Sequence, residues 1–176
     1  MTDLAAYTAI EQLRDGRLIE IRAIRPDDRP AVLAAIARAS PRSMFRRFFA
    51  SRQKLTNEEI DYFLTVDFVN HVALVAVADE DGNRPIVGGA RFVVVQPKKA
   101  EVAFAVIDAY QGQGLGTILM HHLGTIALGA GLRELVAEVL IENMPMLTVF
   151  AHSGYPMSKW LGTDSVHVTL DLGNDR

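Results

Sequence analysis

The chain has 176 residues, of which 49% are hydrophobic and 22% charged, and its formal net charge is −3 at pH 7. That length supplies one ordinary hydrophobic core and is too short for two typical domains. The slightly acidic charge gives no general attraction to nucleic acid or to anionic membranes, so we expect neither as a partner. The sequence contains no cysteine, which excludes disulfides, thiolate metal sites and cysteine nucleophiles. There is no apolar run of about 20 residues and no secretion signal, so we expect a cytoplasmic protein.

The N-terminal segment predicts two helices around one strand. Apolar residues in 1–16 recur at helical spacing and stop at a turn signal, Gly16, which predicts a short leading helix. The alternation over residues 17–24 predicts the first strand. Asp28 is placed to cap a helix over residues 29–39.

Two further helices are predicted before the next strand. Ser40-Pro41 breaks the preceding helix and can start another, whose apolar stripe faces inward and whose arginines face outward. The stripe consists of Met44, Phe45, Phe48 and Phe49, and the arginines are Arg42, Arg46, Arg47 and Arg52. Thr56 and Glu59 form a capping box that predicts a helix reaching about Val66.

The rest of the chain alternates strands and helices. Asp81-Gly82-Asn83 is typical of a hairpin turn, so the first two of these strands, and the third after a short turn, are expected to be antiparallel. A helix between the third and fourth strands makes their pairing parallel. The predicted elements are strands at 72–78, 86–95 and 101–107, a helix at 115–128, a strand at 132–140, a helix at 143–153 and a strand at 166–172.

A glycine-rich segment, residues 111–116, lies between a predicted strand and a predicted helix. Such a turn aims backbone N–H groups and the positive end of the helix dipole at one point, which suits a phosphate or diphosphate. The P-loop and dinucleotide motifs both fail here, since no Gly-Lys-Ser/Thr follows and only Leu115 separates Gly114 from Gly116. The segment alone indicates an anion site; the alternative is a tight connection without a ligand.

In context, this segment resembles the cofactor signature of the GNAT superfamily of N-acetyltransferases. The pattern Gln111-x-x-Gly114-x-Gly116 follows an apolar strand, and Asn143 follows the next strand. Other segments are similar to the catalytic domain of Pat-type bacterial protein lysine acetyltransferases. These are Ile24-Arg25-Pro26-Asp27-Asp28, Arg46-Arg47-Phe48-Phe49, Ala100-Glu101, Asp108-Ala109-Tyr110-Gln111-Gly112 and Glu142-Asn143-Met144-Pro145-Met146.

The resemblance implies an α/β (α+β) fold, with a GNAT-like, mostly antiparallel twisted sheet of six to seven strands flanked by helices. Residues 17–176 would form the N-acetyltransferase domain, and 1–16 an N-terminal extension. Some Pat-type enzymes carry a nucleotide-binding regulatory domain in front, for which we expect no room in this chain. The implied cosubstrate is acetyl-CoA, without a metal.

The resemblance also assigns cofactor-binding residues. The loop 111–117 would hold the coenzyme A diphosphate, and the backbone of 104–106 would pair with the pantetheine arm as an added strand does. Asn143 would contact the cofactor, cap its helix, or do both. His152 is either a polar helix-face residue or a phosphate contact. The full set is Phe104, Ala105, Val106, Gln111, Gly112, Gln113, Gly114, Leu115, Gly116, Thr117, Asn143 and His152.

Glu101 is the candidate catalytic base, because an acceptor ammonium must lose a proton before it can attack the thioester. On the residues alone, Glu101 reads as an exposed strand-end carboxylate; the Ala100-Glu101 match favours the catalytic role. A carboxylate of ordinary pKa is a weak base for this task, so we expect Glu101 to be buried. Many family members protonate the leaving thiolate with a tyrosine where this chain has Phe150. Tyr155 is not assigned as its substitute.

Several other polar residues have modest expected roles. His71 is expected to have a strand-end role, with lining of the acceptor site as the alternative. Asp67 and Asp108 are expected as caps or turn residues rather than catalysts. His121 and His122 diverge by about 100° around a helix and so do not form a metal pair.

The acceptor is open at this stage. A protein lysine is favoured by the Pat-type resemblance, and the rival within the enzyme class is a small amine or polyamine. A coenzyme A-binding module that senses acyl-CoA without turnover is the alternative from another class, and homo-oligomerisation is left open.

Overall fold

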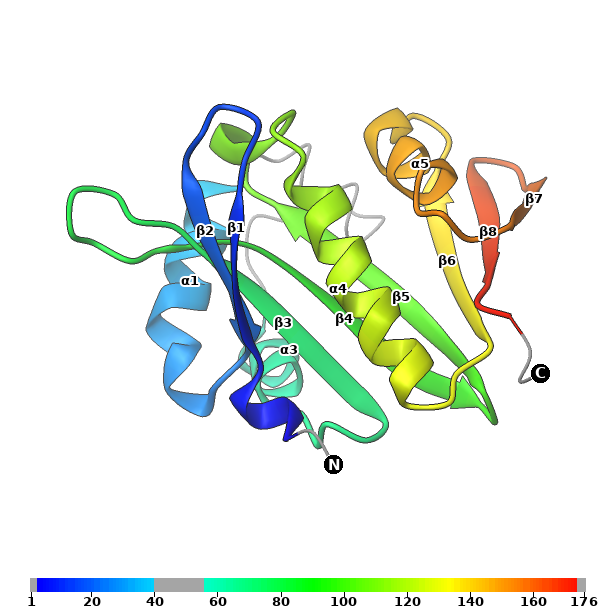
Figure 1. Ribbon diagram of the computed structural model, residues 1–176, viewed down its shortest axis with the longest axis horizontal. Coiled ribbons are helices and arrows are strands. Elements are labelled where there is room, and N and C mark those ends of the chain that lie inside the picture. The colour runs from blue at the N-terminus through cyan, green and yellow to red at the C-terminus, as the bar shows by residue number, and fades with distance from the viewer. Residues whose placement is uncertain (1–2, 40–55, 174–176) are drawn as a thin grey trace.

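Strands rich in Val, Ile and Ala form one eight-stranded sheet in the part of the chain that the computed structural model describes, residues 3–39 and 56–173 (Figure 1). The strand order is β1-β2-β3-β4-β5-β6-β8-β7, and every neighbouring pair is antiparallel except β5 and β6. The strands are β1 (Thr8–Gln12), β2 (Leu18–Ala23), β3 (His71–Val77), β4 (Ile86–Gln96), β5 (Lys99–Val106), β6 (Glu134–Leu140), β7 (Met157–Leu161) and β8 (Ser165–Asp171). The mixed, mostly antiparallel fold is confirmed, with slightly more strands than predicted.

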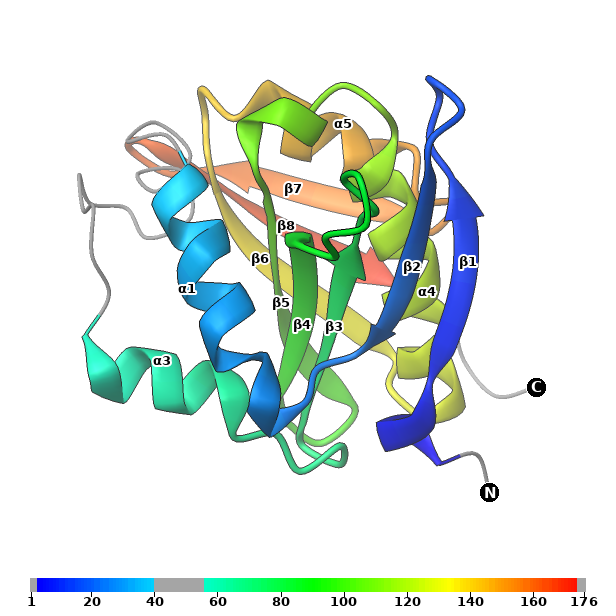
Figure 2. The ribbon, with the colours of Figure 1, turned by 90° about the vertical axis from the view of Figure 1, so that its left-hand side faces the viewer.

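Helices cover both faces of the sheet (Figure 2). One face packs against α1 and α3, and the other against α4, which also contacts α5. The α-helices of the described residues are α1 (Arg29–Arg38), α3 (Asn57–Leu64), α4 (Leu115–Gly129) and α5 (Met144–Ala151), with short 3-10 turns at Leu4–Ala6, Pro26–Asp28 and Asp108–Tyr110. None of these helices is long and apolar enough to cross a membrane. The helix predicted after Ser40, with its aromatic stripe and arginines, lies outside the described residues.

The two expected helix starts differ in their chemistry. Thr56 and Glu59 form the predicted capping box, each side chain accepting the other's backbone N–H at 3.1 and 2.9 Å. Asp28 precedes α1 as predicted, but its carboxylate does not cap that helix. It instead accepts two hydrogen bonds from Arg22, at 2.7 and 2.8 Å, and one from the Arg25 N–H at 2.7 Å. The side chain therefore ties the end of β2 to the start of α1.

The predicted leading helix in residues 1–16 is wrong. After the turn at Leu4–Ala6 the chain forms β1, which pairs with β2 along its whole length. So short a helix is marginal on its own, whereas a strand beside β2 gains a full ladder of hydrogen bonds. Side chains add to this attachment: Tyr7 bonds the Nδ1 atom of buried His122 on α4, and His122 Nε2 lies 2.7 Å from a Glu11 oxygen.

The extra strand that the sequence did not predict at the other margin is β7. Its side chains are mostly exposed, including Trp160 and Leu161, so the strand lacks the alternation of apolar and polar residues that marks a half-buried strand. It pairs with β8 only, at the edge of the sheet.

The feature that positions the candidate site is the split between β5 and β6. The two strands pair in parallel at three residue pairs, Lys99–Glu134, Ala100–Leu135 and Glu101–Val136, and among the described residues at no pair beyond these. They then diverge towards the end of the sheet that carries α5 (Figure 1). Residues 102–106 of β5 therefore keep β4 as a partner on one side and have no strand partner on the other.

Candidate active site

A cavity of about 800 Å³ runs along β5. At one end, here called the loop end, it is lined by the glycine segment, by residues of α5 and by the two cap residues of that helix, Asn143 and His152. At the other, the α1 end, it is lined by Val32, Ala35 and Ile36 of α1 together with Phe63 and Arg91. The strand between them contributes residues 103–107. One cavity thus extends from the N-terminus of α4, along β5, to α1.

The glycine segment at the loop end has the geometry of an anion site. Gly112 and Gly114 have φ values of 75° and 88°, a left-handed conformation that favours glycine. Gly114 is the N-cap of the 15-residue helix α4 and offers no side chain to the N–H groups of its first turn. Gln111 fastens the segment to β5 through a 2.9 Å hydrogen bond from its Nε2 to the Val106 carbonyl. The donors and the helix dipole therefore converge on the cavity, as an anion requires.

Most of the predicted cofactor-binding residues line this one cavity. Gln113 does not: its carbonyl instead accepts the Arg14 N–H at 3.0 Å, which joins the β1–β2 turn to the glycine segment. The predicted residues that line the cavity are Phe104, Ala105, Val106, Gln111, Gly112, Gly114, Leu115, Gly116, Thr117, Asn143 and His152.

The start of α5 forms part of the wall. Asn143 is the N-cap of α5, and its Oδ1 accepts the Met146 N–H at 3.4 Å, so the expected capping role is confirmed while the residue also faces the cavity. Phe150, where many family members have tyrosine, is fully buried and packs edge-to-face on Phe104, with ring centroids 5.8 Å apart. Phe150 therefore packs against β5 through the Phe104 side chain. Tyr155 packs against Gly124 and does not line the cavity.

Glu101 lies at the last β5–β6 pair, between Val93 of β4 and Val136 of β6. Strand alternation puts it on the same face as Ala103 and on the opposite face from Phe104. The side chain is exposed and is not part of the cavity wall, so the burial we expected is not found.

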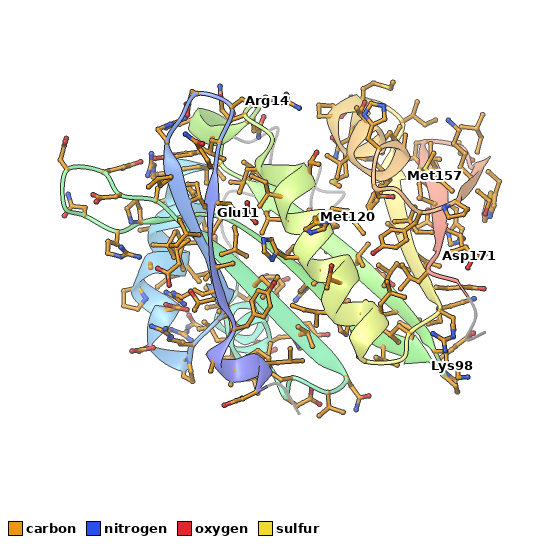
Figure 3. The ribbon with its side chains drawn as sticks, viewed as in Figure 1. Glu11, Arg14, Lys98, Met120, Met157 and Asp171 are labelled. Atoms are coloured by element: carbon orange, nitrogen blue, oxygen red, sulfur yellow. The ribbon has the colours of Figure 1, made fainter. Side chains whose placement is uncertain are left out.

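Arg14 is a cavity residue that sequence reasoning missed. It follows β1 in the turn before β2 (Figure 3). Its Nε atom lies 3.5 Å from the position that a Cβ would take on Gly114. Its side chain lines the loop end of the cavity. This contact was not predicted because a helix was expected over residues 1–16, and only the β1–β2 hairpin brings Arg14 to Gly114. The available signal was that residues 111–117 contain no cationic side chain of their own.

Arg91 is the second missed residue. It occupies the middle of β4, opposite Ala103, and its guanidinium lies 4.2 Å from the Phe63 ring centroid and 5.2 Å from that of Tyr62. Burial lowers the pKa of Arg91, while Tyr62 and then Glu101 act in the opposite direction. The signal for it was a charged residue inside an apolar strand.

The remaining polar residues have structural places. Buried His71 starts β3 as predicted and stacks on Tyr62 with ring centroids 5.1 Å apart. Asp67 accepts three successive backbone N–H groups at 2.9 Å, which confirms its turn role. Within residues 3–39 and 56–173 there is no group of three histidine, aspartate or glutamate side chains that could hold a metal ion.

Comparison with known proteins agrees with this geometry. The model of the acetyltransferase (GNAT) family matches residues 34–155. Acetyltransferase PA5475 of Pseudomonas aeruginosa is 31% identical over 147 residues, which cover 83% of this chain and 79% of that protein. Acetyltransferase Pat of Mycolicibacterium smegmatis is 34% identical over 145 residues, 81% of this chain but only 43% of that protein, so the chain spans less than half of Pat.

A solved structure agrees at the level of the whole fold. The crystal structure of the GNAT domain of S. lividans PAT has a TM-score of 0.84 and 31% identity, covering 93% of this chain and 96% of that one. The split sheet, the glycine segment at the start of α4 and these similarities lead to one conclusion: the chain belongs to the GNAT acetyltransferase family and is an acetyl-CoA-dependent acetyltransferase.

Proposed function

We propose that this enzyme transfers an acetyl group from acetyl-CoA directly to the side-chain amine of a protein lysine. The observation that carries the proposal is the single cavity that joins the N-terminus of α4 to the unpaired side of β5. One end suits a diphosphate and the other admits an acceptor. The preference for a protein lysine rests on the Pat-type resemblance of the sequence.

The cosubstrate would lie along the loop end and β5. Backbone N–H groups of residues 111–117 would bind the diphosphate, with Asn143 and His152 close to it. The pantetheine arm would pair with the backbone of Phe104–Val106, which has no strand partner on that side.

Arg14 would supply the charge that this end of the cavity otherwise lacks. A diphosphate is strongly anionic, and residues 111–117 offer only neutral side chains and backbone. Among the described cavity-lining residues the only arginines are Arg14 and Arg91, there is no lysine, and only Arg14 lies beside the glycine segment. A guanidinium pairs well with phosphate oxygens. We therefore add Arg14 to the proposed cofactor-binding residues.

In the proposed reaction the neutral amine attacks the thioester carbonyl, forming the new C–N bond. Glu101 accepts the proton that the ammonium must lose, through water, since its side chain lies outside the cavity wall. A backbone N–H of β5 would stabilise the oxyanion, an interaction worth about 3 kcal/mol in other enzymes. The C–S bond then breaks, and the proton that the nitrogen loses as the amide forms passes through water to the thiolate, because Phe150 has no hydroxyl group to donate one.

A free-thiol release assay with acetyl-CoA tests the proposal, using a lysine-containing protein extract, lysine peptides and small amines as acceptors. We expect thiol release with protein or peptide acceptors, and mass spectrometry should find acetyl groups on lysine side chains. Turnover with small amines alone would replace the protein substrate by a small-molecule one. Acetyl-CoA binding without thiol release from any acceptor would favour a binding module instead.

A further inference from the structure

At the α1 end of the cavity, Arg91 is a partly buried cation, and one of its nitrogen atoms lacks a hydrogen-bond partner. The Nη1 atom of Arg91 is buried, and it has no hydrogen-bond partner. No ion pair joins Arg91 to any side chain in residues 3–39 or 56–173, although Glu101 is close enough to influence its charge electrostatically. Partial removal of a guanidinium from water without an ion-pair partner is costly, and the rings of Tyr62 and Phe63 offset only part of that cost.

The surroundings of Arg91 leave it available to a ligand. Ala73 of β3 and Ala103 of β5 flank it in the sheet, and both small side chains line the same cavity. The described residues that line this cavity include no aspartate or glutamate. Glu101 acts on Arg91 from outside the cavity wall, so within the cavity a bound ligand is the group that can supply a directly paired counter-charge.

The position of Arg91 also relates it to the reaction. It lies directly across from Ala103, the residue before Phe104, and Cβ atoms of such a pair are about 5 Å apart. An amine that attacks a thioester held beside Phe104–Val106 would bring the groups near it within reach of the guanidinium. The planar fork of arginine matches a carboxylate with two parallel hydrogen bonds.

We propose that Arg91 binds a carboxylate carried by the acceptor close to its reacting amine. This inference rests on the proposed function. The carboxylate would be either an aspartate or glutamate beside the target lysine of a protein, or the carboxylate of a free amino acid. Arg91 thus determines acceptor specificity, while the glycine segment and Arg14 hold the acetyl donor.

Two pairs of acceptors test the proposal and separate the sources. The first pair is a lysine peptide with aspartate and glutamate beside the lysine, and the same peptide with asparagine and glutamine. The second is Nα-acetyl-lysine and its C-terminal amide. In at least one pair we expect kcat/KM to be about 10-fold or more higher for the carboxylate member. A ratio near 1 in both pairs would overturn the proposal.

Variants of Arg91 test whether this residue causes the preference for acceptors that carry a carboxylate. Arg91→Met should bring the carboxylate-to-amide ratio close to 1 without changing the KM for acetyl-CoA, and Arg91→Lys should keep part of the preference. Arg84→Met, which removes an exposed arginine paired with Glu20, is the matched control and should keep the full ratio. Retention of the full ratio in Arg91→Met would contradict the role of Arg91. If Arg91→Met does not fold, Arg91→Lys and the wild-type ratios decide.

A binding measurement keeps this inference distinct from the proposed function. If no acceptor releases thiol, the coenzyme A-saturated protein is titrated calorimetrically with the same two pairs. Selective binding of the carboxylate members would support the Arg91 site although the transfer reaction had failed. Equal or undetectable binding of both members would overturn the site as well.

Discussion

The two ends of the cavity present different chemical groups to a ligand: backbone groups at the loop end and side chains at the α1 end. At the loop end the chain path itself provides the chemistry, because left-handed glycines and the start of α4 direct backbone N–H groups at one point. At the α1 end the chemistry comes from side chains on separate elements, with Arg91 of β4 beside two rings of α3. Backbone groups at the loop end suit acetyl-CoA, which is the donor for every acceptor. The side chains at the α1 end can be replaced by substitution and so can be adapted to a particular acceptor. Changes at the two ends should therefore separate into effects on acetyl-CoA and effects on the acceptor.

The largest effect is expected at Glu101. Replacement by glutamine removes a proton acceptor from the acceptor side, so kcat should fall about 100-fold at neutral pH. The Kd for acetyl-CoA, measured by calorimetry, should stay unchanged because Glu101 does not line the cavity. An unaltered pH-rate profile in Glu101→Gln would remove this residue from the mechanism and break the division between the two ends.

A smaller loss is expected from Gly114→Ala at the loop end. Gly114 has a φ of 88°, and forcing an alanine into that region costs about 1–3 kcal/mol. We expect the KM for acetyl-CoA to rise about 10-fold, as the segment shifts to relieve the strain. Gly129→Ala is the matched control, since Gly129 is the last residue of α4, has no atom within 4 Å of its added Cβ and has no left-handed φ. Equal KM values for the two variants would contradict the role of the loop shape.

Arg14→Ala should have a more modest effect on the same parameter. Loss of one exposed cation beside the diphosphate should raise the KM for acetyl-CoA about 3- to 10-fold and leave kcat nearly unchanged. The difference from wild type should shrink as salt is added, because the charge is not deeply buried. Arg84→Ala provides a control of equal charge change away from the cavity. If both variants gave the same KM, Arg14 would have no specific role.

The smallest effect concerns stability at the α1 end. Burial, and then the charge of Arg91, lowers the pKa of His71 below its ordinary value. The unfolded chain therefore takes up a proton at this residue before the folded one does, so the free energy of unfolding should begin to fall as pH drops below about 6.5. Denaturant unfolding between pH 7.5 and 5.5 measures this slope.

The variant His71→Phe, which keeps a ring against Tyr62, should show a shallower pH dependence over that range. A slope that is the same in His71→Phe and the wild type would show that His71 does not contribute.

The loop end could be predicted from the sequence because its chemistry is local. The spacing of Gly114 and Gly116 after a strand fixes both the turn and the helix start, whatever the rest of the fold does. The strands β3, β4, β5, β6 and β8 were also predicted well, since their apolar runs and hairpin signals are local. Parallel pairing of β5 with β6 follows from the helix between them.

The parts that could not be predicted depend on contacts between distant segments. Residues 8–12 form a strand only because β2 is there to pair with, and Arg14 reaches the glycine segment only through that hairpin. Likewise, the lack of a hydrogen-bond partner for Nη1 of Arg91 depends on the elements that pack around this side chain, and the pattern of β4 alone does not reveal them. The burial expected for Glu101 is not found either, because the exposure of a strand side chain depends on what covers its face of the sheet, which the pattern of β5 alone does not contain.

Because β5 and β6 separate after three residue pairs, the sheet has an edge in its interior in addition to the two at its margins. Unpaired strand edges are templates on which other strands add, and they favour aggregation. A ligand that pairs with the backbone of residues 102–106 closes this edge. The acetyl donor would then act as part of the fold as well as a reactant, and the midpoint of thermal unfolding should rise with its concentration.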